Sequence, residues 1–281
     1  MKTSKTTMTA GILGCLIITG CSSPKPWPES PLYENDLELQ DPTVFDNQLE
    51  DMLAISGNYA HYDIVAYSGS TPNGPLNTFI VSYGFTRFDI EGDQLIQRDK
   101  FCFSEQKSNQ PFVSSFSDEA TQAIIPIPVA VEVTNDGQSL SVYRPQTPTL
   151  LGMEGNPNEP LPMDKDSELI IDDDGDGKPG VTVDLNLFGL IDAELYIARR
   201  EIYETTVYLY EDGSLRGAVV DESEQLVIGA SLWFLDVPNN PDQYVDPGLN
   251  PIILTPVADD FNDCDELKAQ RDIYFPTSPE F

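Results

Sequence analysis

The stretch TTVYLYEDGSLRGAVV (residues 205–220) decides the fold class of this chain. Two runs of alternating apolar and polar residues, rich in β-branched and aromatic side chains, flank an Asp-Gly pair. Because Asp and Gly tolerate the positive φ angles of a tight turn, this pattern predicts a β-hairpin. The stretch AVEVTNDGQSLSVY (residues 130–143) repeats the arrangement and predicts a second hairpin.

Further aromatic and β-branched runs predict strands at residues 59–67, 78–85, 94–103, 181–188, 193–200 and 225–235. In the run 181–188 every second residue is apolar, so one face would be buried and the other would carry Thr182, Asp184 and Asn186. The one helix that we predict is short, at residues 263–270. About 8–10 antiparallel strands with short turns predict an all-β fold, a lipocalin-like antiparallel barrel or a sandwich, because closure removes exposed strand edges.

Two proline-rich stretches interrupt the strand pattern, residues 145–166 and residues 236–256, and each contains five prolines. Both are too long for a turn and too rich in proline for a regular element. We therefore expect long loops at the ends of a barrel, where binding segments often lie.

The composition indicates one large acidic domain. The chain has 281 residues, of which 40% are hydrophobic, and its formal net charge is −32. That apolar content suffices for a single core, which we place at residues 41–281. The charge repels nucleic acid and favours cations, so no nucleic-acid partner is expected.

The first residues predict a secretory signal peptide over residues 1–20. Lys2 and Lys5 precede a short apolar stretch at residues 12–18, and small residues lead to Cys21. Removal of residues 1–20, which contain two lysines and no acidic residue, changes the formal net charge from −32 to −34.

The ending LIITGC (residues 16–21) resembles the lipobox of bacterial lipoproteins. The resemblance implies that Cys21 is lipidated and becomes the first residue of the mature protein. Ser22, where such lipoproteins carry aspartate if they stay at the inner membrane, implies a lipid anchor in the outer membrane, facing the periplasm or the cell surface. Residues 21–40 would then form the lipidated cysteine and a proline-rich tether that holds the domain off the membrane.

Two further cysteines, Cys102 and Cys264, are expected to form a disulfide, because an even pair in an exported protein usually does. Two separate buried thiols are the alternative. The chain has no CxxC redox pair and no cysteine spacing typical of a zinc site.

The run IDDDGDGKPG (residues 171–180) follows the order of a calcium-binding loop. Asp172, Asp174 and Asp176 occupy positions 1, 3 and 5 of the loop pattern, from which carboxylates converge on one ion. Gly177 takes position 6, where the loop makes a sharp turn. The alternative is an acidic turn without a ligand.

The rest of the loop departs from an EF-hand. Lys178 would offer its backbone carbonyl at position 7, but Gly180 has no side-chain ligand and Val183 stands where an EF-hand has glutamate. We expect Asp184, on the polar face of the next strand, to supply the missing carboxylate. The sequence thus predicts a structural calcium site at residues 172–184, with a Kd of about 10⁻⁴–10⁻³ M.

Two family resemblances bear on the fold. The Gly57-Asn58-Tyr59 stretch resembles the opening strand of lipocalins and related calycins, with tyrosine in place of tryptophan. From residue 171 to the end, the chain resembles a group of uncharacterised predicted lipoproteins of two-membraned bacteria. The run DGDGKPGVTV, the strand YIARR, and Cys264 before YFP carry this resemblance, which implies a domain type and no activity.

Catalytic motifs are sparse. His61 is the only histidine, and the chain has no Gly-x-Ser-x-Gly elbow, phosphate loop or HExxH motif. We therefore interpret His61 as a packed or half-exposed strand residue and not as a catalytic base. In the pair Arg199–Arg200, strand alternation places one guanidinium inside and the other outside.

These features predict an outer-membrane-anchored, calcium-binding β-barrel lipoprotein that acts as a ligand-binding or envelope-structural module, more in keeping with a binding protein than with an enzyme. A carboxylate-dependent hydrolase of envelope glycans and an adhesion or assembly factor are the alternatives. An apolar cavity would favour a small apolar ligand, two carboxyls about 5–10 Å apart in a cleft would favour the hydrolase, and a flat apolar patch would favour an envelope protein.

Overall fold

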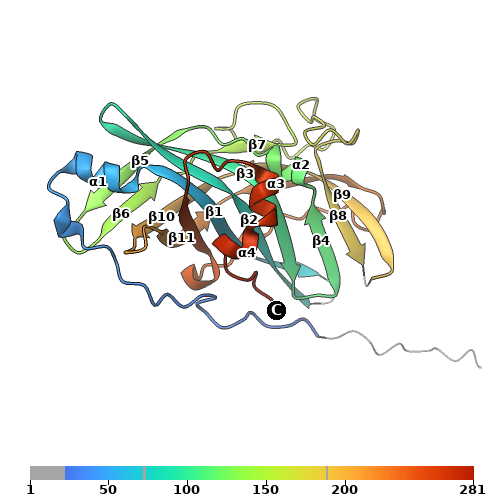
Figure 1. Cartoon of the computed structure of the whole chain (residues 1–281). Coiled ribbons are helices and arrows are strands. Elements are labelled where there is room, and N and C mark those ends of the chain that lie inside the picture. Colours follow the sequence, from blue (N-terminus) through green and yellow to red (C-terminus); the bar gives the residue numbers. More distant parts are fainter. Residues whose placement is uncertain (1–22, 72–73, 188) are drawn as a thin grey trace, which may run out of the picture.

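The computed structural model describes residues 23–71, 74–187 and 189–281 (Figure 1). Strands dominate these residues, which confirms the predicted all-β class. The described part of the chain contains 14 strands, more than the 8–10 predicted, because β4, β7, β13 and β14 lie in stretches without an alternating pattern. None of its helices is long and apolar enough to span a bilayer.

Eight strands close into one antiparallel barrel. Each pairs with the next barrel strand along the chain, and β14 pairs back with β1, so the order is an up-and-down meander. The barrel strands are β1 (Gly57–Thr71), β2 (Gly74–Glu91), β3 (Gln94–Ser108), β5 (Val129–Asn135), β6 (Leu140–Arg144), β10 (Tyr203–Leu209), β11 (Leu215–Asp221) and β14 (Pro251–Val257).

One end of the barrel is closed by tight turns and a helix. The turns between β2 and β3, β5 and β6, and β10 and β11 contain Gly92, Gly137 and Gly213, whose φ angles are 67°, 79° and 79°. Both predicted Asp-Gly hairpins are thus confirmed. Helix α1 (Gln48–Ile55) covers this end, and its Ile55 packs into the apolar core inside the barrel. The sequence pattern missed α1 because eight residues show barely two turns of periodicity.

At the other, open end, the connections after β3, β6 and β11 are long, and they build a second sheet. The connection after β3 contributes β4 (Phe112–Phe116) to this sheet. The connection after β6 contributes β7 (Thr149–Leu151), β8 (Val181–Leu187) and β9 (Ile191–Glu201). The connection after β11 contributes β12 (Glu224–Ala230). The strands pair in the order β12-β9-β8-β4, with β7 also on β9. The remaining short elements are α2 (Asp118–Gln122), β13 (Asp242–Gln243), η1 (Pro42–Val44) and η2 (Pro247–Leu249).

The proline-rich stretch at residues 236–256 is not a loop throughout. Its last part forms β14, which pairs with β1 and β11 and completes the barrel. Our expectation was wrong here because Pro251 and Pro256 lie near the ends of the strand, where a missing N–H costs least. The other stretch, residues 145–166, contributes only the three-residue β7.

The N-terminal segment, which we expected to be a proline-rich tether that holds the domain off the membrane, is packed against the barrel. Trp27 lies against Phe79 and Phe281, with ring centroids 5.0 and 5.3 Å apart. Farther along, Leu32 N donates to Gly248 O (2.9 Å). Because these side chains cover apolar residues on the outer face of β1 and β2, residues 23–40 lie along the barrel and do not act as a spacer.

The C-terminal segment covers the same outer face. The Cys102–Cys264 disulfide, with a Cα–Cα distance of 5.2 Å, joins β3 to helix α3 (Cys264–Ala269) and confirms the predicted pairing. Asp263 caps α3 through Glu266 N, so the helix predicted at residues 263–270 is confirmed as well. A short α4 (Arg271–Tyr274) follows.

Candidate functional site

A cavity of about 590 Å³ separates the barrel from the second sheet. Tyr67, Thr78 and Ile80 line it from the barrel, and Leu185 and Leu195 line it from the second sheet. The loop that follows β12 forms a third side. Most of the lining side chains are apolar, so the cavity suits the apolar part of a small molecule.

A smaller cavity of about 90 Å³ adjoins the first and extends into the open end of the barrel. Tyr67, Ile80, Phe116 and Arg199 line both cavities. Helix α2 and strand β9 cover the smaller cavity from outside the barrel. The long connections of the open end therefore create both cavities.

A polar cluster lies where the two cavities meet. Arg199 is 5% exposed, and its Nε donates to Glu201 Oε1 (2.6 Å). Its Nη atoms donate to Gln225 Oε1 (3.1 Å) and to the Tyr67 hydroxyl (3.2 Å). The Tyr67 hydroxyl in turn donates to Asp221 Oδ1 (2.8 Å). The cluster thus holds a buried cation between two carboxylates.

Burial shifts the titration of this cluster. It raises the pKa of Asp221, and the nearby Glu201 carboxylate raises it further. Burial also raises the pKa of the Tyr67 hydroxyl well above its ordinary value. For Arg199, burial acts to lower the pKa, but Glu201, Tyr67 and Asp221 together outweigh it and the pKa is raised, so the guanidinium stays charged.

A second polar network lies inside the barrel. His61 Nε2 is 2.7 Å from Asp63 Oδ2, and His61 Nδ1 is 2.7 Å from the Thr86 hydroxyl. Thr86 donates to Asp99 Oδ1 (2.7 Å), and the Tyr203 hydroxyl donates to Asp99 Oδ2 (3.0 Å). Because Thr86 is fully buried and donates to Asp99, it is not an accessible nucleophile beside His61. His61 is a packed strand residue, as its position predicted.

Arg144 completes this network. It is 0% exposed, and its Nε lies 3.5 Å from Asp99 Oδ2. Its guanidinium carbon stands 3.8 Å from the centre of the Tyr203 ring, and Nη1 donates to Tyr203 O (2.8 Å). The two networks give the inner end of the cavities a polar character.

The charges that face the smaller cavity are mainly negative. Asp63, Glu201 and Asp221 line it, against the one guanidinium of Arg199. Each of these carboxylates accepts a hydrogen bond from, or lies within hydrogen-bond distance of, a neighbouring side chain. A hydroxyl or amine therefore fits this end better than a phosphate or a carboxylate.

The structure brings together three of the predicted calcium ligands. Carboxylate oxygens of Asp172, Asp174 and Asp176 all lie within 4.8 Å of one another. Asp174 Oδ2 accepts from Thr182 N (2.8 Å), whereas the buried Asp174 Oδ1 has no hydrogen-bond partner among the described residues. Burial and then the Asp176 carboxylate raise the pKa of Asp174. An oxygen without a donor, beside two other carboxylates, fits an oxygen-ligated cation.

Of the two other predicted ligands, Lys178 was expected to contribute its backbone carbonyl and Asp184 its carboxylate. Lys178 places its ammonium 2.8 Å from Glu194 Oε1 and 3.4 Å from Asp176 Oδ2. Asp184 is exposed, lies opposite Glu194 in the pairing of β8 with β9, and is not a member of the three-aspartate group. Thr182, which we expected on the polar face of β8, is buried and donates to Asp176 Oδ2 (2.6 Å).

Glycines shape the loop that carries these aspartates. Gly177 has a φ of +84°, as the sharp turn at loop position 6 requires. At Gly180, φ is +81° and an added Cβ would lie 2.3 Å from Ile197 O, so only glycine fits. Gly180 N donates to Ile171 O (2.7 Å), which closes the loop at its base.

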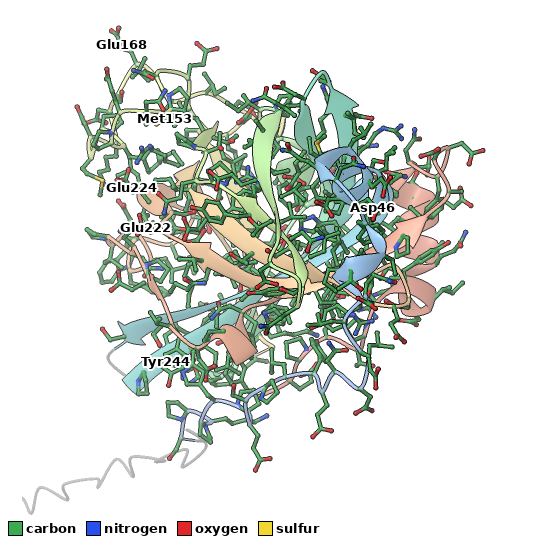
Figure 2. All side chains as sticks on the ribbon, turned by 90° about the vertical axis from the view of Figure 1, so that its left-hand side faces the viewer. Asp46, Met153, Glu168, Glu222, Glu224 and Tyr244 are labelled. Carbon is green, nitrogen blue, oxygen red and sulfur yellow. A yellow bond between two sulfur atoms is a disulfide. The ribbon has the colours of Figure 1, made fainter. Side chains whose placement is uncertain are left out.

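The aspartate loop and the N-terminal segment lie on opposite sides of the molecule. Figure 2 shows Met153, which pairs with Ile170 just before the loop, far from Tyr244. The Tyr244 ring packs against Trp27, with centroids 5.0 Å apart. A metal in the loop would therefore support the far side of the second sheet.

Several site residues carried a weak sequence signal or none. Alternation correctly placed one of two neighbouring arginines inside: Arg199 faces the cavity, and Arg200 donates to Pro157 O (2.6 Å) on the other face. Asp221 and Arg144 were missed, because each is a single charge at the end of an ordinary strand. Cys21 lies outside the described residues.

Comparison of the chain with models of protein families, with curated proteins and with solved structures found no match.

Proposed function

We propose that this protein is an outer-membrane-anchored, calcium-binding β-barrel lipoprotein that binds a small amphipathic ligand. The cavity of about 590 Å³ between the barrel and the second sheet carries this proposal. It lies within the size range of ligand sites, which are mostly apolar with a few polar groups.

The ligand would lie differently from the ligand of a lipocalin. Lipocalins are eight-stranded up-and-down barrels that hold one small molecule inside. Here apolar side chains and the His61–Arg144 network fill much of the barrel, and the larger space lies outside its open end. The apolar part of the ligand would occupy this larger cavity, and a hydroxyl or amine would reach Asp221 and Glu201.

A cavity-filling variant tests ligand binding. Thr78→Trp places a large side chain in the larger cavity, and Thr206→Trp makes the same change on an exposed position of β10. We expect the neutral apolar probe N-phenyl-1-naphthylamine to bind the native protein and the Thr206→Trp variant alike. Thr78→Trp should weaken binding at least tenfold. Absence of binding, or equal binding by all three proteins, contradicts the proposal.

The calcium part of the proposal rests on the unpartnered Asp174 oxygen in the three-aspartate group. Asp172, Asp174 and Asp176 would hold the ion, which would neutralise their mutual repulsion and fix the start of β8. Calorimetry and thermal melts with calcium and chelator test it. Asp174→Asn with Asp176→Asn should abolish the calcium-dependent heat and melting shift.

A matched control for calcium removes the same charge elsewhere. Asp93 and Asp260 are exposed and lie outside the aspartate group. Asp93→Asn with Asp260→Asn should leave the calcium response unchanged. An equal loss in this control would mean that calcium acts through net charge, and no response in the native protein would mean that the loop is an acidic turn.

The anchor is tested through Cys21. Cys21→Ser should leave the precursor uncleaved by the lipoprotein signal peptidase and without acyl chains. Mass spectrometry of the membrane-extracted protein reads out both changes. A variant with normal mature mass that still partitions into detergent would show that the lipobox resemblance misleads.

A further inference from the structure

Five apolar side chains lie on or beside the larger cavity, and we call them the apolar rim: Leu190, Ile191, Trp233, Phe234 and Val237. Trp233 is 87% exposed and Leu190 86%, and the other three are 47–53% exposed. Phe234 and Val237 also line the cavity. Large apolar side chains gathered in this way at a cavity mouth indicate a contact surface.

The rim lies at one end of the second sheet. Leu190 lies in the turn between β8 and β9, and Ile191 is the first residue of β9. The segment after β12 begins beside the same part of β9, because Ser231 N donates to Glu194 O (2.9 Å). The start of β4 is also there, since Phe112 pairs with Leu187.

The N-terminal segment begins at this same end. Lys25 N donates to Asn109 O (3.1 Å), and the Asn109 side chain donates to Lys25 O (3.0 Å). Asn109 precedes Gln110, Pro111 and the other cavity-lining residues before β4. In Figure 1 the blue N-terminal segment runs below β1 and β4 on the lower side of the molecule.

Chain length limits how far an anchor can lie from the cavity. Cys21 is four residues before Lys25. Four residues span at most about 14 Å even when fully extended. Because residues 23–40 pack along the barrel, they cannot lengthen this reach. A lipid on Cys21 would hold the rim close to the bilayer.

We propose that the rim docks on the lipid bilayer and that the larger cavity takes up an acyl chain of a membrane lipid through it. This inference rests on the proposed anchor and ligand cavity. None of the five rim residues is charged, although the chain as a whole is strongly acidic. Of the two carboxylates next to them in the chain, Asp236 pairs with Lys165 (2.9 Å) and Asp192 accepts a hydrogen bond from Asn186 (2.7 Å). Aromatic side chains such as Trp233 favour the membrane interface.

Fluorescence of Trp233 tests the docking. The chain has two tryptophans, so Trp27→Phe leaves Trp233 as the only reporter. The lipidated protein is reconstituted into zwitterionic phosphatidylcholine vesicles whose acyl chains are brominated, and flotation shows whether it is attached. We expect bromine to quench at least half of the Trp233 emission. Attached protein without quenching overturns the docking.

A matched reporter at the opposite end controls for proximity alone. Tyr208 is 38% exposed on β10, near the closed end of the barrel. In a chain with Trp27→Phe and Trp233→Phe, Tyr208→Trp should remain unquenched on the same vesicles. Equal quenching at both positions would mean that the protein has no fixed orientation, which also overturns the proposal.

Uptake of lipid is measured separately. Delipidated protein incubated with the same vesicles and re-isolated should carry a phospholipid in native mass spectrometry. Leu190→Ser with Trp233→Ser should slow uptake at least fivefold, and the exposed Val220→Ser should not. Binding of the apolar probe without any uptake contradicts loading from the membrane but leaves the cavity intact. Failure of probe binding contradicts the proposed function itself, and failure to float contradicts the anchor.

Discussion

Replacing Arg144 with methionine tests whether the ion network inside the barrel stabilises the fold. Arg144 is fully buried, with its Nε 3.5 Å from Asp99 Oδ2. At an effective dielectric constant of about 20, two unit charges at this distance attract by about 5 kcal/mol. Much of that attraction offsets the cost of removing two ions from water, so the net value of the pair is small.

The cost of breaking the pair is larger than its net value. Arg144→Met leaves the Asp99 carboxylate buried without its cation, and Tyr203 O loses a donor at 2.8 Å. Loss of one partner of a buried pair costs about 3–5 kcal/mol. Asp99 keeps its hydrogen bonds from Thr86 and Tyr203, so we expect the free energy of unfolding to fall by about 3 kcal/mol.

Urea unfolding followed by circular dichroism measures this change. Arg98→Met is the control, because Arg98 on β3 is 38% exposed and pairs with Asp89 at the surface. It should cost at most about 1 kcal/mol. Adding Asp99→Asn to Arg144→Met should recover part of the loss by removing the unpaired charge. If Arg144→Met costs no more than Arg98→Met, the reasoning is refuted.

Three further changes have defined outcomes. Cys102→Ala with Cys264→Ala opens a loop of 162 residues and should lower the free energy of unfolding by about 2–5 kcal/mol in urea melts. A decrease of less than about 1 kcal/mol would contradict the loop-entropy argument. The raised pKa of Asp221 means that the folded state binds its proton more tightly than the unfolded state, whose pKa is near 3.8, so stability is lost as pH rises through the folded pKa. The free energy of unfolding of Asp221→Asn should therefore rise relative to that of the native protein between pH 4 and pH 7. If urea melts show the same difference between the two proteins at every pH, this reasoning is wrong. Gly180→Ala should lower the free energy of unfolding by at least about 2 kcal/mol, and Gly177→Ala should lower it by about 1 kcal/mol. Both glycines have a positive φ, but only at Gly180 would an added Cβ meet a backbone oxygen. Equal melting temperatures for the two variants would contradict this reasoning.

Local patterns alone were sufficient to predict part of this protein. Asp-Gly pairs between alternating runs identified two hairpins, because the turn and the strand period are properties of neighbouring residues. Asp263 before a short helical run located α3, since a helix cap is also local. The disulfide was predicted because two cysteines were left to pair in a chain that we expected to be exported.

Other features depended on contacts between distant segments. Pro251 and Pro256 argued against a strand, but pairing with β1 and β11 made β14 part of the barrel. Residues 21–40 were expected to form a proline-rich tether, yet Trp27, Leu32 and Tyr33 in this segment pack against apolar side chains on the outer face of the barrel. Neither outcome is visible in local composition, because in both cases the stabilising partner lies far away in the sequence.

By itself, the sequence determined the strands with an alternating pattern, the Asp-Gly turns, the acidic loop and the cysteine pair, since each depends on residues close together or on a simple count. Only the tertiary structure decided where the cavity lies and which charges face it. Tyr67, Arg199 and Asp221 come from three separate strands, and they meet because every long connection leaves the barrel at the same end. The physical reason is that closing the meander fixes which ends of the strands lie together, and burial at that junction then sets the charge and hydrogen bonding of each side chain.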